Sequence, residues 1–196
     1  MKKTFLLLLF SALAWSQEKP KKDFRVIPEF YFGFALDSFQ GDNYLAKDHK
    51  SPSIGGQMKI NLLHYKNFNL GMVLNRGSIN LSDEVLSIAR TNINSLGGAI
   101  SYSYLVNKKW ILAPEISYSK SELRQKESSG TYNFGDQDGN KVSFGINVKY
   151  KLYRQIGLFA AVHYSHYNLQ VNTTPEFQNY FDHTKAITFS VGFTVL

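Results

Sequence analysis

The chain carries a regular alternation of apolar and polar positions that begins at Phe24. Every second residue from Phe24 to Leu36 is apolar, whereas the positions between them include Arg25, Glu29 and Asp37. Successive side chains of a β-strand point to opposite faces, so a period of two is typical of a strand with one apolar face. The pattern therefore predicts a strand over residues 24–37.

The same alternation recurs in seven later segments, each with one apolar face and one face rich in Gly, Ala, Ser or Asn. None of them is an apolar run of helical length, which excludes a helical membrane protein. We expect strands over residues 54–62, 68–75, 96–106, 110–119, 141–150, 157–165 and 187–195.

The connections between these segments alternate in length between tight turns and long polar loops. The turns lie at 65–67, 107–109 and 153–155, and the loops at 38–52, 78–91, 121–140 and 170–184. Short turns on one side, long loops on the other, and an even number of strands of roughly 10 residues are typical of outer-membrane barrels. The sequence therefore predicts an all-β fold, an eight-stranded antiparallel up-and-down transmembrane β-barrel over residues 24–196.

The alternation alone leaves open which face of the strands meets lipid. Small side chains on the polar face suit the narrow interior of an eight-stranded barrel. Four aromatic residues fall beside the short turns, where an interfacial aromatic girdle is expected: Tyr104, Trp110, Tyr150 and Tyr153. We therefore expect the apolar face to point outward. The alternative is a soluble periplasmic lipocalin-like ligand-binding barrel, which predicts an apolar cavity.

Two prolines conflict with regular strands. Pro28 and Pro114 fall inside predicted strands, where the missing N–H leaves a carbonyl of the neighbouring strand unpaired. We expect a bulge or nearby water at each position.

The N-terminal residues have the pattern of an export signal. Lys2 and Lys3 precede an apolar run of about eleven residues, which is shorter than the roughly 20 residues of a membrane-spanning helix. Small residues at Ala14 and Ser16 fit signal-peptidase cleavage before Gln17. We predict a signal peptide over 1–16, a polar leader over 17–23, and export to the bacterial outer membrane.

Composition narrows the function further. The formal net charge is +7, but charged residues make up only 19% of the chain and aromatic residues 15%, which excludes a polycationic nucleic-acid binder and a disordered chain. The absence of cysteine excludes a disulfide scaffold, a thiolate zinc site and a cysteine nucleophile. Because the five histidines are scattered along the chain, we expect no metal site and no cofactor.

Charged residues also occur on the face predicted to line the barrel. They include Arg25, Glu29, Lys59, Glu115 and Lys149, with Asp37, Lys141 and Lys151 on the same face. A buried charge is tolerated only when it is paired, so we expect an interior polar network. Eight strands enclose a space that side chains just fill, which disfavours a diffusion pore. A gated proton or ion path is the alternative interpretation of these charges.

One short string resembles a catalytic pair. His163 and Ser165 lie two residues apart, and therefore on one face of a strand, and Glu176 in the following loop can orient the histidine. The pair is similar to the His-x-Ser of outer-membrane lipid A deacylases, in which it faces the membrane. Here the alternation turns both side chains inward, so a hydrogen-bonded interior pair is the favoured interpretation and no catalysis is assigned. A lipid A acyl hydrolase is the alternative.

Residues 17–196 resemble the small outer-membrane β-barrel families, OmpA/OmpX-like and PorT-like, of Bacteroidetes-type Gram-negative bacteria. The resemblance rests on Trp15-Ser16-Gln17 at the signal end, on the rhythm of strands and turns, and on the closing segment 189–196. That segment resembles the terminal strand that the barrel-assembly machinery recognises. The resemblance implies a monomer in contact with outer-membrane lipid and lipopolysaccharide, with a structural or interaction role, in adhesion or in the envelope, through its extracellular loops.

Overall fold

The computed structural model describes residues 23–49, 52–80, 88–127, 133–170 and 174–195. The signal peptide expected over 1–16 and the leader expected over 17–23, apart from Asp23, lie outside the described residues. Within these ranges, no helix is long and apolar enough to cross a membrane.

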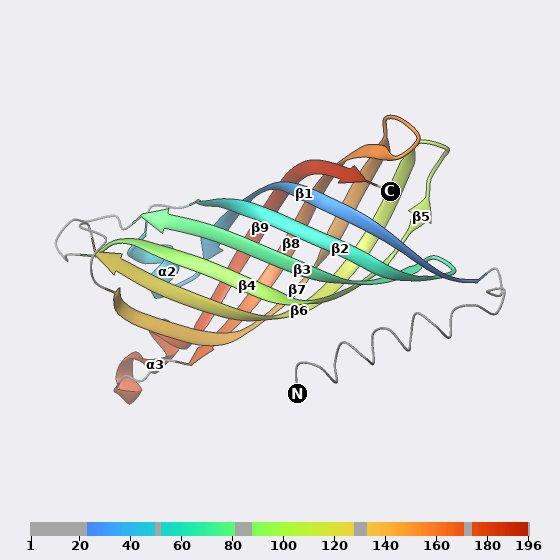
Figure 1. Cartoon of the computed structure of the whole chain (residues 1–196). Coiled ribbons are helices and arrows are strands. Elements are labelled where there is room, and N and C mark those ends of the chain that lie inside the picture. The colour runs from blue at the N-terminus through green and yellow to red at the C-terminus, as the bar shows by residue number, and fades with distance from the viewer. Residues whose placement is uncertain (1–22, 50–51, 81–87, 128–132, 171–173, 196) are drawn as a thin grey trace, which may run out of the picture.

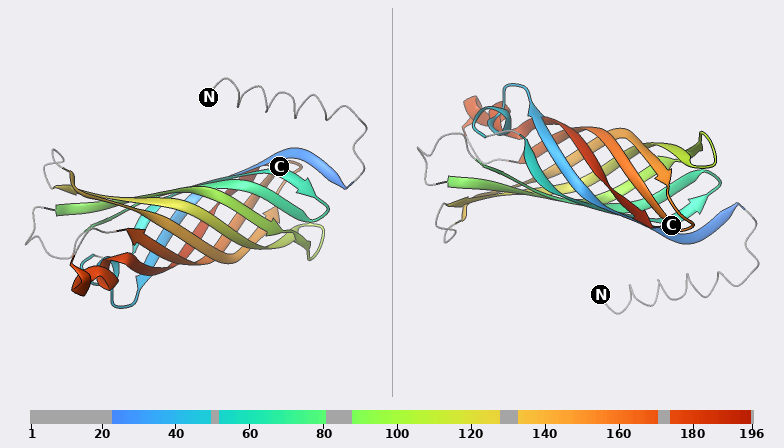
Figure 2. Two further views of the ribbon diagram at one scale, coloured as in Figure 1. Left: turned by 90° about the horizontal axis from the view of Figure 1, so that it is seen from below. Right: turned by 90° about the horizontal axis from the view of Figure 1, so that it is seen from above.

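The strands close into one antiparallel barrel (Figures 1 and 2). The strands are β1 (Phe24–Gln40), β2 (Ser53–Tyr65), β3 (Phe68–Asn80), β4 (Ile88–Tyr102), β5 (Tyr104–Leu105), β6 (Trp110–Glu127), β7 (Asn133–Lys151), β8 (Ile156–Gln170) and β9 (His183–Val195). β1 pairs with β9 and β4 pairs with β6, which closes the sheet. β5 continues β4 beyond a break at Ser103, and both pair with β6. Because β4 and β5 form one interrupted strand, the nine segments make up eight barrel strands, and the predicted barrel is confirmed.

The two ends of the barrel differ, as the alternation of connections predicts. One end carries the three tight turns, the start of β1 and the end of β9, and we call it the turn end (Figure 1). The other, the loop end, carries two short helices, α2 (Tyr44–Lys47) and α3 (Pro175–Asp182).

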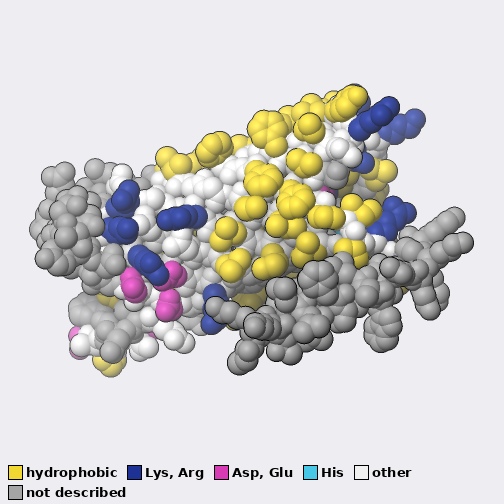
Figure 3. Space-filling model, viewed as in Figure 1, with side chains coloured by type: hydrophobic (Ala, Val, Ile, Leu, Met, Phe, Trp, Pro, Cys, Tyr) yellow, Lys and Arg dark blue, Asp and Glu magenta, His cyan; other side chains and the backbone are white. Residues whose placement is uncertain are grey.

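An apolar belt covers the outside of the barrel next to the turn end, as the yellow side chains of Figure 3 show. Phe34 is 74% exposed on this surface. Other exposed members of the belt are Leu70, Met72, Leu96, Ile100, Ile116, Phe144, Val162, Phe189, Val191 and Phe193. Charged side chains lie inside the barrel, where a soluble ligand barrel requires an apolar lining. The arrangement is that of a barrel surrounded by lipid, because water is unfavourable for such a belt.

The strands extend farther toward the loop end than predicted. β6 and β7 continue through most of the segment expected to be a loop over 121–140, so that boundary is wrong. Beyond the belt the outward positions meet water, and they carry polar residues such as Glu122 and Arg124. The ladder therefore continues without the apolar alternation that reveals it in sequence. Leu123, between these two residues, is buried inside the barrel.

Both strand prolines lie where the ladder is interrupted. The pairing of β1 with β2 shifts register between Val26 and Glu29, which places Pro28 in a bulge. The pairing of β4 with β6 ends at Glu115 and that of β5 begins at Leu112, so Pro114 lies opposite the break between β4 and β5. The expectation of a bulge is met at Pro28, and a strand break takes its place at Pro114.

One pair of adjacent glycines shows how closely neighbouring strands approach each other. A Cβ atom added at Gly97 would overlap the Tyr118 carbonyl oxygen, whereas one added at Gly98 would lie 3.9 Å from the nearest atom. Gly97 points into the barrel and Gly98 points outward. The inner position therefore requires glycine for steric reasons, and the outer one has room for a side chain.

Candidate functional site: the barrel interior and its cap

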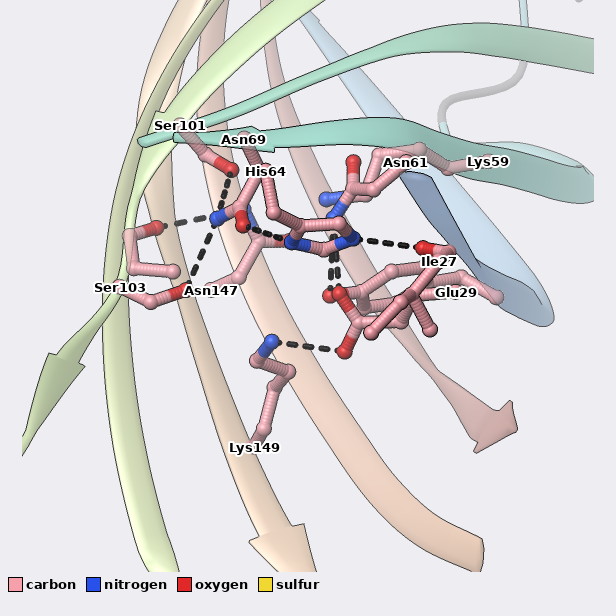
Figure 4. Close-up of polar contacts among 12 residues, drawn as sticks. Ile27, Glu29, Lys59, Asn61, His64, Asn69, Ser101, Ser103, Asn147 and Lys149 are labelled. Atoms are coloured by element: carbon pink, nitrogen blue, oxygen red, sulfur yellow. Dashed lines mark hydrogen bonds and ion pairs between the residues drawn. The ribbon is translucent and has the colours of Figure 1, made fainter. Parts of the chain in front are cut away.

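An ion pair crosses the interior near the turn end (Figure 4). Lys149 Nζ on β7 lies 2.8 Å from Glu29 Oε1 on β1. Asn61 on β2 donates to the second Glu29 oxygen at 2.9 Å. All three side chains are buried, so the charge-assisted hydrogen bonds replace the water that the ions lose. These contacts connect β1, β2 and β7 across the barrel interior.

A second ion pair lies next to the first. Lys59 Nζ is 2.5 Å from Glu115 Oε2, and the two side chains are each 3% exposed. Asn147 donates to the same oxygen at 3.2 Å, and His163 Nε2 lies 3.4 Å from Glu115 Oε1. The ammonium group also stands 4.1 Å from the centre of the Tyr31 ring, a cation–π contact. Four of the charges expected inside the barrel, Glu29, Lys59, Glu115 and Lys149, thus form two ion pairs.

Arg25, expected in this network, is instead exposed at the turn end. It lines an open vestibule of about 570 Å³ whose lining also includes the buried Glu29 and Lys149. The barrel therefore narrows from an open mouth to a filled interior within a few residues of β1. The alternation in sequence gives the direction of a side chain but not its depth along the barrel axis.

The proposed catalytic set is not assembled. Ser165 is fully buried and its hydroxyl lies 2.8 Å from that of Ser143. The cavity that Ser165 shares with His163 has a volume of about 10 Å³, room for about one water molecule. Glu176 is exposed on α3 at the loop end, and the carboxylate near His163 is that of Glu115. Both side chains of the pair point inward, as the alternation predicts.

An apolar plug closes the interior at the loop end, and sequence reasoning missed it. Leu45 of α2 is 1% exposed and packs with inward-facing residues of six strands. These residues are Phe39, Ile79, Ile93, Leu123, Tyr167, Leu169 and Ala186. The only sequence signal is the apolar pair Tyr44-Leu45 within a polar loop, directly after Asn43. Asn43 is the helix N-cap and accepts from the Ala46 N–H at 3.1 Å.

Polar contacts hold this plug to the wall and to α3. His49 Nε2 lies 2.7 Å from the Thr91 hydroxyl on β4, and its Nδ1 lies 3.3 Å from the Tyr44 carbonyl oxygen. Burial lowers the pKa of His49. Tyr180 of α3 donates to Asp48 at 3.0 Å, and burial together with this hydrogen bond raises the pKa of Tyr180 to about 12. Burial in the plug therefore favours the neutral form of His49.

The four aromatic residues predicted to form a girdle lie beside the tight turns. Tyr104, Trp110 and Tyr153 are exposed, and Tyr150 is half-buried. The Trp110 and Tyr150 rings have centroids 4.7 Å apart. They stand at the edge of the apolar belt, where an aromatic ring can meet both lipid and water.

Sequence comparison identifies no relative, and structure comparison identifies the fold. No protein-family model and no curated protein matches the chain. Ail of Yersinia pestis has a TM-score of 0.56 at 13% identity, covering 89% of this chain and 99% of Ail. Neisserial surface protein A has a TM-score of 0.57 at 14% identity, covering 86% and 96%. OprG of Pseudomonas aeruginosa has a TM-score of 0.56 at 11% identity, covering 89% and 96%.

The fold is that of small outer-membrane β-barrels. At these identities the similarity establishes the architecture alone. The expected relationship to the OmpA/OmpX-like and PorT-like families, and the Bacteroidetes source, stay predictions. Among the described residues, no group of three or more His, Asp or Glu side chains lies close enough together to hold a metal ion.

Proposed function

We propose that this chain is an outer-membrane protein that acts as a closed, membrane-anchored platform and presents its loop end to envelope or surface partners. The filled interior carries the proposal. Two ion pairs cross the barrel, and the plug at Leu45 closes it above them. A filled barrel offers solutes no wide path, so its function is expected on the surfaces that it displays.

The outer surface supports contact with two kinds of lipid. The apolar belt matches the acyl chains of a bilayer. Beyond the belt toward the loop end, Arg76, Lys120 and Arg124 project outward, where they can pair with phosphate groups of lipopolysaccharide. β9 ends the barrel at the turn end and is the segment that we propose the barrel-assembly machinery recognises. With its wall complete in one chain, the protein is proposed to act as a monomer.

The loop end is suited to protein contact because it carries charged side chains on strands that continue beyond the belt. β6 and β7 carry outward Arg124, Asp136 and Asp138 well beyond the belt, on a continuous ladder. α3, which lies at the same end of the barrel next to β8 and β9 (Figure 1), adds the exposed Glu176. Ail, one of the proteins that share the fold, is named an attachment invasion locus protein. Adhesion is therefore the form of partner contact that we propose first.

Topology can be tested with single cysteines, since the natural chain has none. We expect Glu176→Cys to react with a membrane-impermeant maleimide on intact cells. Arg154→Cys, in the tight turn between β7 and β8, is the matched control and should react only after the outer membrane is opened. Both variants should fractionate with the outer membrane and show a mobility shift on boiling. Labelling of Arg154→Cys on intact cells, or recovery in the soluble periplasm, would overturn the proposed placement.

Two further measurements test the platform itself. In planar bilayers the folded protein should give no steady conductance, and stable open channels would contradict the filled interior. In a whole-cell adhesion assay, the double substitution Asp136→Lys and Asp138→Lys should change attachment, while Lys66→Gln at the turn end should not. Equal attachment of all strains, including a strain that lacks the protein, would remove the adhesion role.

A further inference from the structure

An apolar groove runs along the lipid-facing wall of the barrel from the turn end. Its volume is about 660 Å³, within the range of sites that hold small molecules. Trp110 and Tyr150 line its end beside the tight turns, and Phe34 and Val191 line its other end. The floor is low at Ala160 because this outward position carries only a methyl group, and Gly192 on the neighbouring strand faces the barrel interior. The groove is therefore an elongated slot, a suitable shape for an acyl chain.

Two cationic turns stand directly at the open end of this groove. Lys108 and Lys109 lie in the turn before β6, and Arg154 lies in the turn between β7 and β8; all three are exposed. The Lys151 backbone N–H donates to the Lys109 carbonyl oxygen at 2.8 Å, which holds the two turns side by side. Lys109 Nζ lies 5.9 Å from the centre of the Tyr150 ring, which itself lines the groove.

The charge of this rim is uncompensated in the local sequence. The segments 104–114 and 139–175 contain no Asp or Glu. Figure 3 shows Lys and Arg side chains beyond the apolar belt at the turn end. A cationic cluster of two turns that adjoins an acyl-sized slot matches a molecule with an anionic head and an apolar tail.

We propose that the groove and the two turns form a binding site for an anionic phospholipid of the leaflet on the turn side, the periplasmic leaflet in the proposed placement. One acyl chain lies in the slot over Ala160 and Gly192. The phosphate group is held by Lys108, Lys109 and Arg154. The proposal rests on the proposed membrane placement and deepens it, because it names a lipid class that one side of the barrel selects.

The chain contains its own reporter for this site. Of its two tryptophans, Trp15 belongs to the predicted signal peptide and Trp110 lines the groove. In the processed protein, Trp110 fluorescence therefore reports on the molecules in the slot. Bromine on an acyl chain quenches tryptophan only at short range, so brominated lipids reveal which headgroup class is enriched there.

The experiment places the processed protein in phosphatidylcholine vesicles that contain a minor fraction of one brominated lipid. Brominated phosphatidylglycerol is compared with brominated phosphatidylcholine of the same chains at the same mole fraction. A Lys or Arg close to an anionic membrane surface contributes about 1 kcal/mol, which corresponds to about fivefold enrichment per phosphate contact. We expect phosphatidylglycerol to be enriched around Trp110 by at least that factor, and the preference to disappear at high salt.

Matched variants locate the site. Replacing Lys108, Lys109 and Arg154 with Gln should remove the headgroup preference, whereas Lys66→Gln, in a tight turn that does not adjoin the groove, should keep it. Ala160→Phe should fill the slot and reduce quenching by both lipids. Val162→Phe points outward from the same strand but outside this groove, and it should leave quenching unchanged.

The outcomes separate the two proposals. A protein that fails to enter vesicles and shows no heat-dependent mobility shift overturns the proposed membrane placement. An inserted protein that is quenched equally by both lipids keeps that placement but overturns the lipid site. An inserted protein that neither lipid quenches has its groove covered by another chain, which also overturns the lipid site. The salt dependence applies to the natural sequence, so it decides the question even if the triple variant does not fold.

Discussion

Removing the Glu115 carboxylate is the most direct test of how the interior stabilises the barrel. Glu115→Leu leaves the Lys59 ammonium group, which is 3% exposed, without its partner at 2.5 Å. Removal of one member of a buried ion pair costs about 3–5 kcal/mol. The Tyr31 ring, 4.1 Å from the ammonium group, remains and offsets about 1–2 kcal/mol of that cost. We therefore expect the free energy of unfolding to fall by about 3 kcal/mol.

The double substitution Lys59→Met with Glu115→Leu separates the charge from the packing. It removes both ions, and the remaining loss is the hydrogen bond that Asn147 donates to Glu115, worth about 1–2 kcal/mol. The double variant should therefore be more stable than Glu115→Leu alone. Glu122→Gln is the matched surface control: its pair with Arg124 is partly exposed, and such pairs contribute about 0.2–1 kcal/mol.

The assay is reversible urea unfolding of the protein in vesicles, followed by Trp110 fluorescence and by the mobility shift on unheated gels. A Glu115→Leu variant whose free energy of unfolding lies within about 1 kcal/mol of that of the natural protein would refute the argument, because a buried unpaired ammonium group should destabilise the fold by more than that. A double variant as unstable as the single one would assign the loss to packing. Either result would show that the ion pairs do not stabilise the filled interior.

Three further outcomes are expected. Gly97→Ala should prevent or slow barrel formation, seen on unheated gels, because the new Cβ would overlap the Tyr118 carbonyl oxygen, while Gly98→Ala should fold normally. Burial lowers the pKa of His49, so the unfolded segment binds more protons than the folded plug, and the plug loses stability as the pH falls through 6.5. Protease cleavage near α2 should therefore speed up over that range, and His49→Gln should remove the pH dependence. Ser165→Ala should leave the lipid A mass spectrum of producing cells unchanged; a spectrum that depends on Ser165 would restore the hydrolase alternative.

The sequence predicts the wall of this barrel well because lipid imposes one rule on it. Every outward position in the belt must be apolar, so the period of two identifies strands and faces together, as it does at Phe34 and Ala35. The same rule places His163 and Ser165 inside, which the structure shows. The tight turns follow from the polar residues that interrupt the period.

Outward positions need to be apolar only within the belt, so the sequence predicts the strands less accurately beyond it. Beyond the belt both faces of β6 and β7 can be polar, and the ladder continues unmarked through Arg124. The plug depends on long-range packing between Leu45 and strands far away in sequence, which no local period records. Arg25 has the correct facing but lies too near the barrel mouth to be buried.

The distribution of charge in the molecule favours surface function over transport. Inside, Glu29 and Glu115 each have a cation within 2.8 Å, so moving an ion past them means breaking a pair that costs several kcal/mol to separate. Outside, the cations of the tight turns have no acid in their own segments, and their water-facing charge is available without any such cost. Interior charges that are already paired stabilise the fold, whereas the cations of the tight turns are available to bind a partner. On this argument the interior stabilises the structure, and we propose that both rims carry the side chains that bind lipid and protein.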